Sequence, residues 1–195
     1  MFWDQARLLS SFQHSYQGSY EKALSILETY SPENKLYQGT SQLQQAGIAL
    51  LQRDVSEFER LEQSFGNYYQ LTPYEEVLSL SKKELAEIKP KSPFVAGLLS
   101  SIVPGAGRFY IGKPGEGIAT LLVAGIFTAQ TLEAYRKDGV RDPRFIIFGS
   151  LLSITYVSNI WGSVLAVKVS NLEKNNQINE NILLNMHIPL RVIFD

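Results

Sequence analysis

After Lys91 the chain contains three long stretches without a charged residue, and this feature restricts its fold most strongly. Residues 145–167 (FIIFGSLLSITYVSNIWGSVLAV) carry no charge, and neither do residues 117–132 (GIATLLVAGIFTAQTL) or residues 92–107 (SPFVAGLLSSIVPGAG). An α-helix rises about 1.5 Å per residue, so about 20 mostly apolar residues cross the hydrocarbon core of a bilayer. These stretches therefore predict an integral membrane protein that contacts membrane lipid.

The segment before these stretches has the opposite composition, and the whole chain therefore averages to a mean hydropathy of -0.06. The change falls at Lys89-Pro90-Lys91, which we interpret as a domain boundary. The sequence predicts a soluble helical domain over residues 1–90, a transmembrane hairpin domain over residues 91–170 and a polar tail over residues 171–195. The net charge of -1 provides no general attraction for a nucleic acid, so we expect none as a partner.

Residues that could carry catalysis or hold a metal are scarce. The chain has no cysteine, and its two histidines, His14 and His187, lie far apart in sequence. They are too few for most zinc sites, which use about three or four protein ligands. Gly112-Lys113 invites comparison with a phosphate-binding loop, but Pro114 stands where such a loop needs serine or threonine to hold magnesium. We therefore expect no enzymatic activity, no cofactor and no metal.

Residues 3–88 carry apolar side chains at helical spacing, which predicts a set of amphipathic helices arranged as antiparallel hairpins. The segment from Gly18 to Pro32, with a small residue at Ala23, resembles the second helix of a tetratricopeptide repeat. Such repeats bind peptides or proteins on a concave face, so the resemblance implies partner-binding residues in this segment: Tyr20, Ala23 and Leu24. An ordinary small helical bundle is the alternative interpretation.

The first apolar stretch is interrupted by Pro104 and Gly105, where a helix is expected to end or kink. The apolar residues 94–103 are too few for a full span. This stretch is thus a short or kinked crossing, a re-entrant half-helix or a helix that lies in the interface. The predicted fold class is all-α, with tetratricopeptide-like hairpins followed by two or three transmembrane helices.

The residues around this interruption form a motif, Ser92-Pro93, Pro104-Gly105-x-Gly107-x-x-Tyr110-x-Gly112 and, later, Asn159, Gly162 and Asn171. The motif resembles a family of small bacterial envelope membrane domains, in which a PGxGxxYxG turn precedes a transmembrane hairpin, often behind tetratricopeptide-like helices. This chain has Arg108 where the family usually has glutamine, which adds a fixed charge at the turn. The candidate residues of the membrane turn are Pro104, Gly105, Gly107, Arg108, Tyr110 and Gly112.

Two strongly hydrogen-bonding side chains, Gln130 and Asn159, lie inside the apolar stretches. Polar groups in lipid cost free energy unless they are paired, so both are functional candidates, although a single amide also commonly hydrogen-bonds between helices. Together with Arg108 they could serve a small oligomeric channel or transporter, which is the alternative function. Small residues in the same stretches favour close helix packing, either within the hairpin or between copies in a homo-oligomer.

The final residues, HIPLRVIFD, alternate with the period of a β-strand. A lone strand leaves its edges unpaired. The tail is therefore expected to pair with another chain by strand addition, to rest on the membrane surface or to pack back on the bundle. Its alternating apolar residues are further partner-binding candidates: Ile188, Leu190, Val192 and Phe194.

The first residues, MFWDQARLLSSFQHS, lack the basic start, apolar run and cleavage site of a signal peptide. We therefore expect the first apolar stretch to direct the chain to the membrane. Lysine and arginine on short loops favour the cytoplasm, and with two or three crossings they are more numerous on the side of residues 1–90. The helical domain is expected to face the cytoplasm from a bacterial inner membrane, or the periplasm if a signal peptide has been removed.

The main expected function is that of an integral membrane adaptor or accessory subunit of a bacterial envelope complex. In this interpretation the helical domain binds a protein partner and the hairpin anchors it in the membrane.

Overall fold

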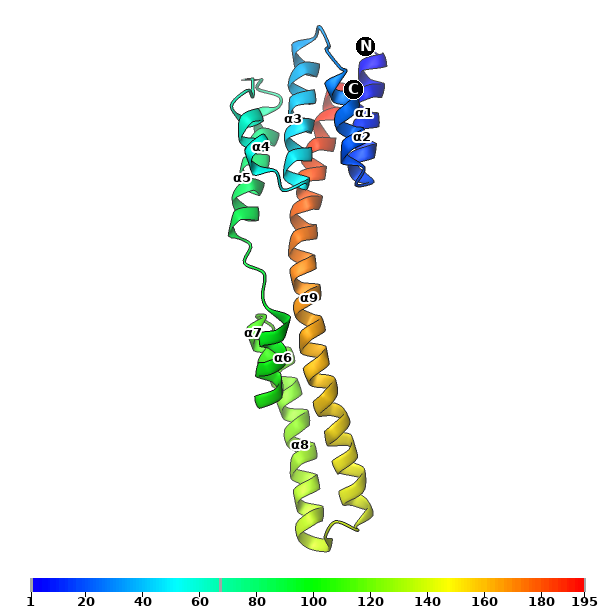
Figure 1. Cartoon of the computed structure of the whole chain (residues 1–195), viewed down its shortest axis with the longest axis vertical. Helices are drawn as coiled ribbons and strands as arrows, with labels where there is room; N and C mark the ends of the chain where they lie inside the picture. Colours follow the sequence, from blue (N-terminus) through cyan, green and yellow to red (C-terminus); the bar gives the residue numbers. More distant parts are fainter. Residues whose placement is uncertain (1, 67, 195) are drawn as a thin grey trace. The chain divides into compact units, whose positions relative to one another are not determined.

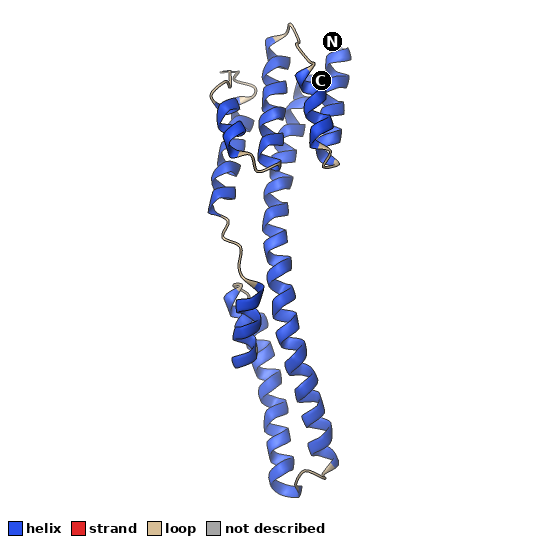
Figure 2. Ribbon diagram, in the orientation of Figure 1, coloured by secondary structure: helices blue, strands red, loops and turns tan. Residues whose placement is uncertain are grey.

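The structure is a computed structural model that describes residues 2–66 and 68–194, and within these ranges every regular element is an α-helix (Figures 1 and 2). The predicted all-α fold class is thereby confirmed. The helices are α1 (Phe2–Tyr16), α2 (Tyr20–Glu28), α3 (Lys35–Leu51), α4 (Val55–Glu62), α5 (Thr72–Glu87), α6 (Pro93–Ile102), α7 (Ala106–Tyr110), α8 (Pro114–Asp138) and α9 (Pro143–Phe194).

The chain forms two compact units. The helical unit consists of residues 1–88 together with residues 174–195, and the membrane unit consists of residues 89–173. Helix α9 therefore contributes its first part to the membrane unit and its last part to the helical unit.

The core of the helical unit is built from one apolar face of each of its helices. Leu8 of α1, Leu27 of α2, Leu43 of α3, Phe58 of α4 and Leu78 of α5 are almost completely buried. Complete burial of such a side chain stabilises the folded state by about 1.5–3 kcal/mol. The helices begin at capping residues, since the side chains of Asn34 and Asp54 accept hydrogen bonds from backbone N–H groups in the first turns of α3 and α4.

The last described residues, up to Phe194, are helical, and the expected strand-like segment is therefore wrong. Ile178, Ile182, Met186 and Leu190 follow one another at intervals of four residues, and all four are buried in the core of the helical unit. This spacing places them on one face of a helix. A Cβ atom at Gly47 of α3 would lie 2.3 Å from Met186 Sδ, so any larger residue there would force the Met186 side chain to shift. Among the expected alternatives, packing back on the bundle is the one observed.

An ion pair joins α4 to α5 at the surface of the helical unit. Lys82 Nζ lies 2.7 Å from Glu62 Oε2, and Ser79 Oγ donates to Glu62 Oε1 at 2.5 Å. Burial acts to raise the pKa of Glu62, but the hydrogen bonds from Lys82 and Ser79 outweigh it and hold this pKa below its ordinary value. The same hydrogen bond raises the pKa of Lys82, so both groups are charged at neutral pH.

The membrane unit contains two helices that are long and apolar enough to cross a bilayer, α8 and α9. Only 17% of the most apolar window of α8 and 6% of that of α9 is buried. A core helix of a water-soluble protein would bury most of such a window, so these apolar faces are suited to lipid. Helix α6 has 10 residues and is therefore about 15 Å long, about half the thickness of the hydrocarbon core.

Candidate functional site

The membrane turn, Pro104–Gly112, brings the end of α6, all of α7 and the start of α8 into close contact. Gly105 has a φ of 89°, and a Cβ atom there would lie 2.3 Å from the backbone oxygen of Gly117. A Cβ atom at Gly107 would lie 2.5 Å from the backbone oxygen of Ala96. These glycines are required by backbone contacts within the protein, which leave no room for a ligand at either position.

A buried polar cluster lies beside this turn and contains Asn159, Ser100 and Ser163. Asn159 Oδ1 accepts from the backbone N–H of Gly105 at 3.2 Å, and its Nδ2 donates to the backbone oxygen of Ser100 at 3.2 Å. Ser100 Oγ donates to Ser163 Oγ at 2.7 Å and accepts from the backbone N–H of Gly107 at 3.0 Å. Asn159 thus satisfies backbone groups that the interrupted helix leaves unpaired.

A second set of contacts involves Tyr110 and the segment that leads into α6. The backbone of Lys91 exchanges two hydrogen bonds with the side chain of Asn171, at 3.1 Å and 2.8 Å. Tyr110 Oη accepts from the backbone N–H of Ser92 at 3.2 Å, and Lys91 Nζ donates to the backbone oxygen of Tyr110. The motif residues Ser92, Tyr110 and Asn171 therefore meet in space, and they tie α9 and α7 to the start of α6.

The three residues considered for a channel do not come together among the described residues. Arg108 pairs with Glu116, with Nη1 and Oε2 2.5 Å apart, and Asn159 is occupied by the turn. Gln130 is exposed on α8, 13 residues beyond Gly117 and thus about 20 Å further along the helix. The membrane turn is therefore a structural site, with polar groups that hold the unit together.

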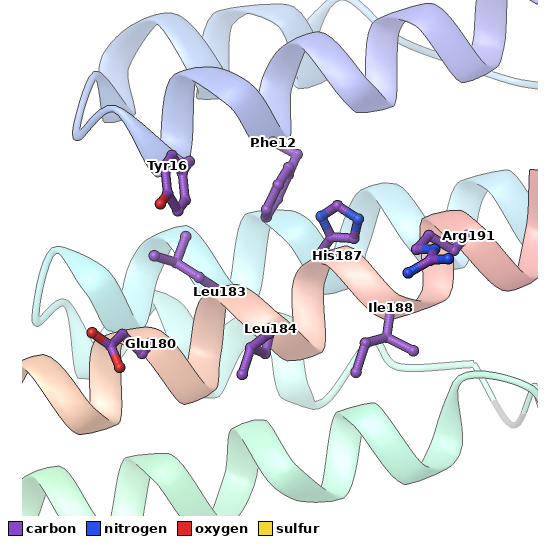
Figure 3. Close-up of a pocket in the computed structure, with 8 residues that line it drawn as sticks. All are labelled: Phe12, Tyr16, Glu180, Leu183, Leu184, His187, Ile188 and Arg191. Carbon is purple, nitrogen blue, oxygen red and sulfur yellow. The ribbon is translucent and has the colours of Figure 1, made fainter.

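The helical unit carries an open groove between α1 and the last part of α9 (Figure 3). Its cavity volume is about 640 Å³. The ring of His187 packs edge-on against Phe12, with centroids 4.8 Å apart, and forms the floor between the two helices. The groove is lined by Phe12, Tyr16, Glu180, Leu183, Leu184, His187, Ile188 and Arg191.

One of the predicted partner-binding residues lines this groove, and the others lie in or against the core or are exposed elsewhere. Ala23 and Leu190 are fully buried and are thus unavailable to a partner. Tyr20 and Leu24 are half-buried against the core, and Phe194 packs near Tyr37 with ring centroids 6.4 Å apart.

Ile188 lines the groove, whereas Val192 is exposed outside the set of residues that line it. Of the residues that line the groove, only Ile188 was a sequence-predicted candidate; His187 and Arg191 lie in the segment that was taken for a strand, and the other five were not singled out. A helical signal was present, since Glu180, Leu184, His187 and Arg191 follow the 4-3-4 spacing of one helix face. Within residues 2–66 and 68–194, no group of histidine, aspartate or glutamate side chains is arranged to hold a metal ion.

Comparison with known proteins agrees with the membrane assignment. Residues 89–132 match the TM2 domain family, a stretch that contains α6, α7 and most of α8. An uncharacterized protein of Methanocaldococcus jannaschii is 56% identical over 36 residues, which are 18% of this chain and 36% of that protein. The match thus spans little more than a third of the relative's length. No solved structure matches the chain. The TM2 match and the two exposed apolar helices together identify a membrane protein.

Proposed function

We propose that this protein is a non-catalytic adaptor, in which the membrane unit provides the anchor and the helical unit binds a protein partner. The observation that carries the proposal is the composition of the helical unit, since residues from both ends of the chain share one core. Ile182, Met186 and Leu190 are buried together with Leu8 and Leu43. This shared core supports a topology in which the two ends lie on the same side of the membrane.

An even number of crossings is part of the proposal, and the shared core supports it. Helices α8 and α9 supply two, and α6 is too short to supply a third. In this topology α6 and α7 enter the membrane or lie at its surface without crossing it. Proline and glycine at the membrane turn are tolerated at that depth because Asn159 and Ser100 pair with the backbone there.

The distribution of positive charge supports a cytoplasmic helical unit. With two crossings, one side holds eight lysine and arginine residues close to the membrane, and the loop between α8 and α9 holds four. The eight are Lys82, Lys83, Lys89, Lys91, Arg108, Lys113, Lys168 and Lys174, and the four are Arg136, Lys137, Arg141 and Arg144. A bacterial inner membrane, as the motif resemblance implies, is part of the proposal.

Cysteine labelling in intact cells tests the topology, and the absence of native cysteine gives a clean background. Three exposed positions serve as reporters: Gln17→Cys, Val140→Cys and Asn176→Cys. A maleimide that cannot cross the membrane is expected to label only Val140→Cys. A label on Asn176→Cys alone, or labels on Gln17→Cys and Val140→Cys but not on Asn176→Cys, would indicate three crossings and contradict the proposal. Labels on Gln17→Cys and Asn176→Cys alone would reverse the orientation and retain two crossings.

The adaptor function is tested against the channel or transporter. Protein extracted from its native membranes with a mild detergent, after crosslinking, is expected to carry a protein partner at a constant ratio. The purified chain in liposomes is expected to give no ion flux above that of empty liposomes, because Arg108, Gln130 and Asn159 do not converge. An ion flux above that of empty liposomes, or the lack of any partner after crosslinking, would overturn the adaptor.

A further inference from the structure

One face of the last part of α9 combines apolar and charged side chains in an order that a partner helix could match. Glu180, Leu184, His187 and Arg191 lie along this face at the spacing of helices that pack side by side. Glu180 and Arg191 stand at its two ends, 11 residues and thus about 16 Å apart (Figure 3). Neither side chain forms an ion pair or hydrogen bond within the described ranges.

The groove beside this face is open to its surroundings. Leu184 is 58% exposed and Ile188 is 40% exposed, while Tyr16 of α1 is 71% exposed on the opposite wall. A small-molecule site usually encloses most of its ligand, which this groove cannot do. An amphipathic helix, in contrast, needs an open apolar trough and presents anchors at the same three- and four-residue spacing.

We infer that this groove receives one amphipathic α-helix of a partner protein, about three turns long, with a basic side chain near Glu180 and an acidic one near Arg191. The apolar side chains of that helix would contact Leu184, Ile188 and Phe12. A partner helix with one basic and one acidic side chain is favoured over one with two like charges. Two acids would place one of them beside Glu180, and two bases would place one beside Arg191, and both arrangements are repulsive. This inference rests on the proposed adaptor function and specifies the chemistry of its partner.

Three fluorescent helical peptides of equal length and equal apolar content serve as probes for the full-length protein in nanodiscs. Each carries two charged residues 11 positions apart on its apolar face: one lysine and one glutamate, two glutamates or two lysines. The wild-type protein is expected to bind the mixed peptide most tightly. Glu180→Lys should prefer the diacidic peptide and Arg191→Glu the dibasic peptide, with a change of about threefold in Kd for each exposed charge pair. The preferences of the two charge variants do not depend on the direction of the peptide, because the diacidic and dibasic peptides carry the same charge at both positions.

A matched pair of variants tests the apolar part of the groove. Leu184 and Val192 are both 58% exposed on α9, but Val192 does not line the groove. Leu184→Asp is expected to weaken binding of the mixed peptide at least about tenfold, and Val192→Asp to change it less than about twofold. Both substitutions are at exposed positions, so unfolding temperatures measured by circular dichroism should match that of the wild type.

Several results would overturn the inference. The first is that no peptide binds more than it binds to empty nanodiscs. The second is that the charge variants keep the peptide preference of the wild type. The third is that Leu184→Asp and Val192→Asp weaken binding of the mixed peptide equally. A stable dimer that Leu184→Asp dissociates would also overturn it, since a second copy would then fill the groove. If a crosslinked partner is still recovered, each of these results rejects the groove as the binding site but is consistent with the adaptor function. Ion flux in liposomes would reject the adaptor function independently of the peptide results.

Discussion

Deletion of residues 174–195 is expected to unfold the helical unit, although the deleted segment is distant in sequence from helices α1–α5. Ile182, Met186 and Leu190 are fully buried in the shared core. Truncation of one such side chain to alanine costs about 2–5 kcal/mol, and whole domains are stable by only about 5–15 kcal/mol. Limited proteolysis in detergent should cleave α1–α5 of the shortened protein rapidly, while the membrane unit remains protected.

A graded version of the experiment uses single substitutions in the intact chain. Met186→Ala should lower the free energy of unfolding of the helical unit by about 2–5 kcal/mol. Val192→Ala, at an exposed position six residues later on the same helix, should change this free energy by about 0.5 kcal/mol or less. Equal effects of the two substitutions would show that the end of α9 does not enter this core, and the argument for two crossings would fail with it.

The second large effect is expected at the membrane turn, where Gly105→Ala should strongly destabilise the membrane unit. Gly105 and Gly112 have nearly the same φ, 89° and 84°. A Cβ atom at Gly105 would meet the backbone oxygen of Gly117 at 2.3 Å, whereas one at Gly112 meets nothing within 4 Å. Gly112→Ala should therefore cost only the free energy of holding alanine in the left-handed conformation, about 1–2 kcal/mol. Gly105→Ala adds a clash between backbone segments, and we expect a total of at least about 4 kcal/mol.

Tryptophan fluorescence can measure the difference in stability between Gly105→Ala and Gly112→Ala in the membrane unit alone. The chain contains two tryptophans, Trp3 in the helical unit and Trp161 in the membrane unit. Because Trp3 is exposed, Trp3→Phe should leave the fold intact and make Trp161 the reporter of unfolding in increasing dodecyl sulfate. If Gly105→Ala and Gly112→Ala unfold at the same detergent fraction, the close approach of Gly105 to Gly117 is contradicted.

The membrane turn shows how far a motif can be interpreted from sequence. The spacing of Gly105, Gly107 and Tyr110 indicated a turn before a hairpin, and these residues do lie at one. Their roles could not be assigned in advance, because the bonds from Asn159 and Asn171 reach across 54 and 80 positions. The polar side chain of Asn159 within an apolar stretch suggested a functional pathway, but its hydrogen bonds pair with backbone groups of the turn.

The tail shows the opposite case, in which a local pattern was misleading. Four alternating apolar residues, from Ile188 to Phe194, match a strand, yet the longer series Ile178, Ile182, Met186 and Leu190 matches a helix and is the one that becomes buried. A short alternation also occurs within helices, so only the longer window distinguishes the two periods. Two groove residues, His187 and Arg191, lie in the segment that this alternation assigned to a strand.

Hydropathy and helical periodicity are properties of neighbouring residues, and they were sufficient to establish the helical class, the lipid-facing half and the break at Pro104. The return of α9 into the core of α1–α5, and the groove that this return creates, depend on contacts between opposite ends of the chain. Such contacts follow from the shape and burial of complementary faces, which no local pattern contains.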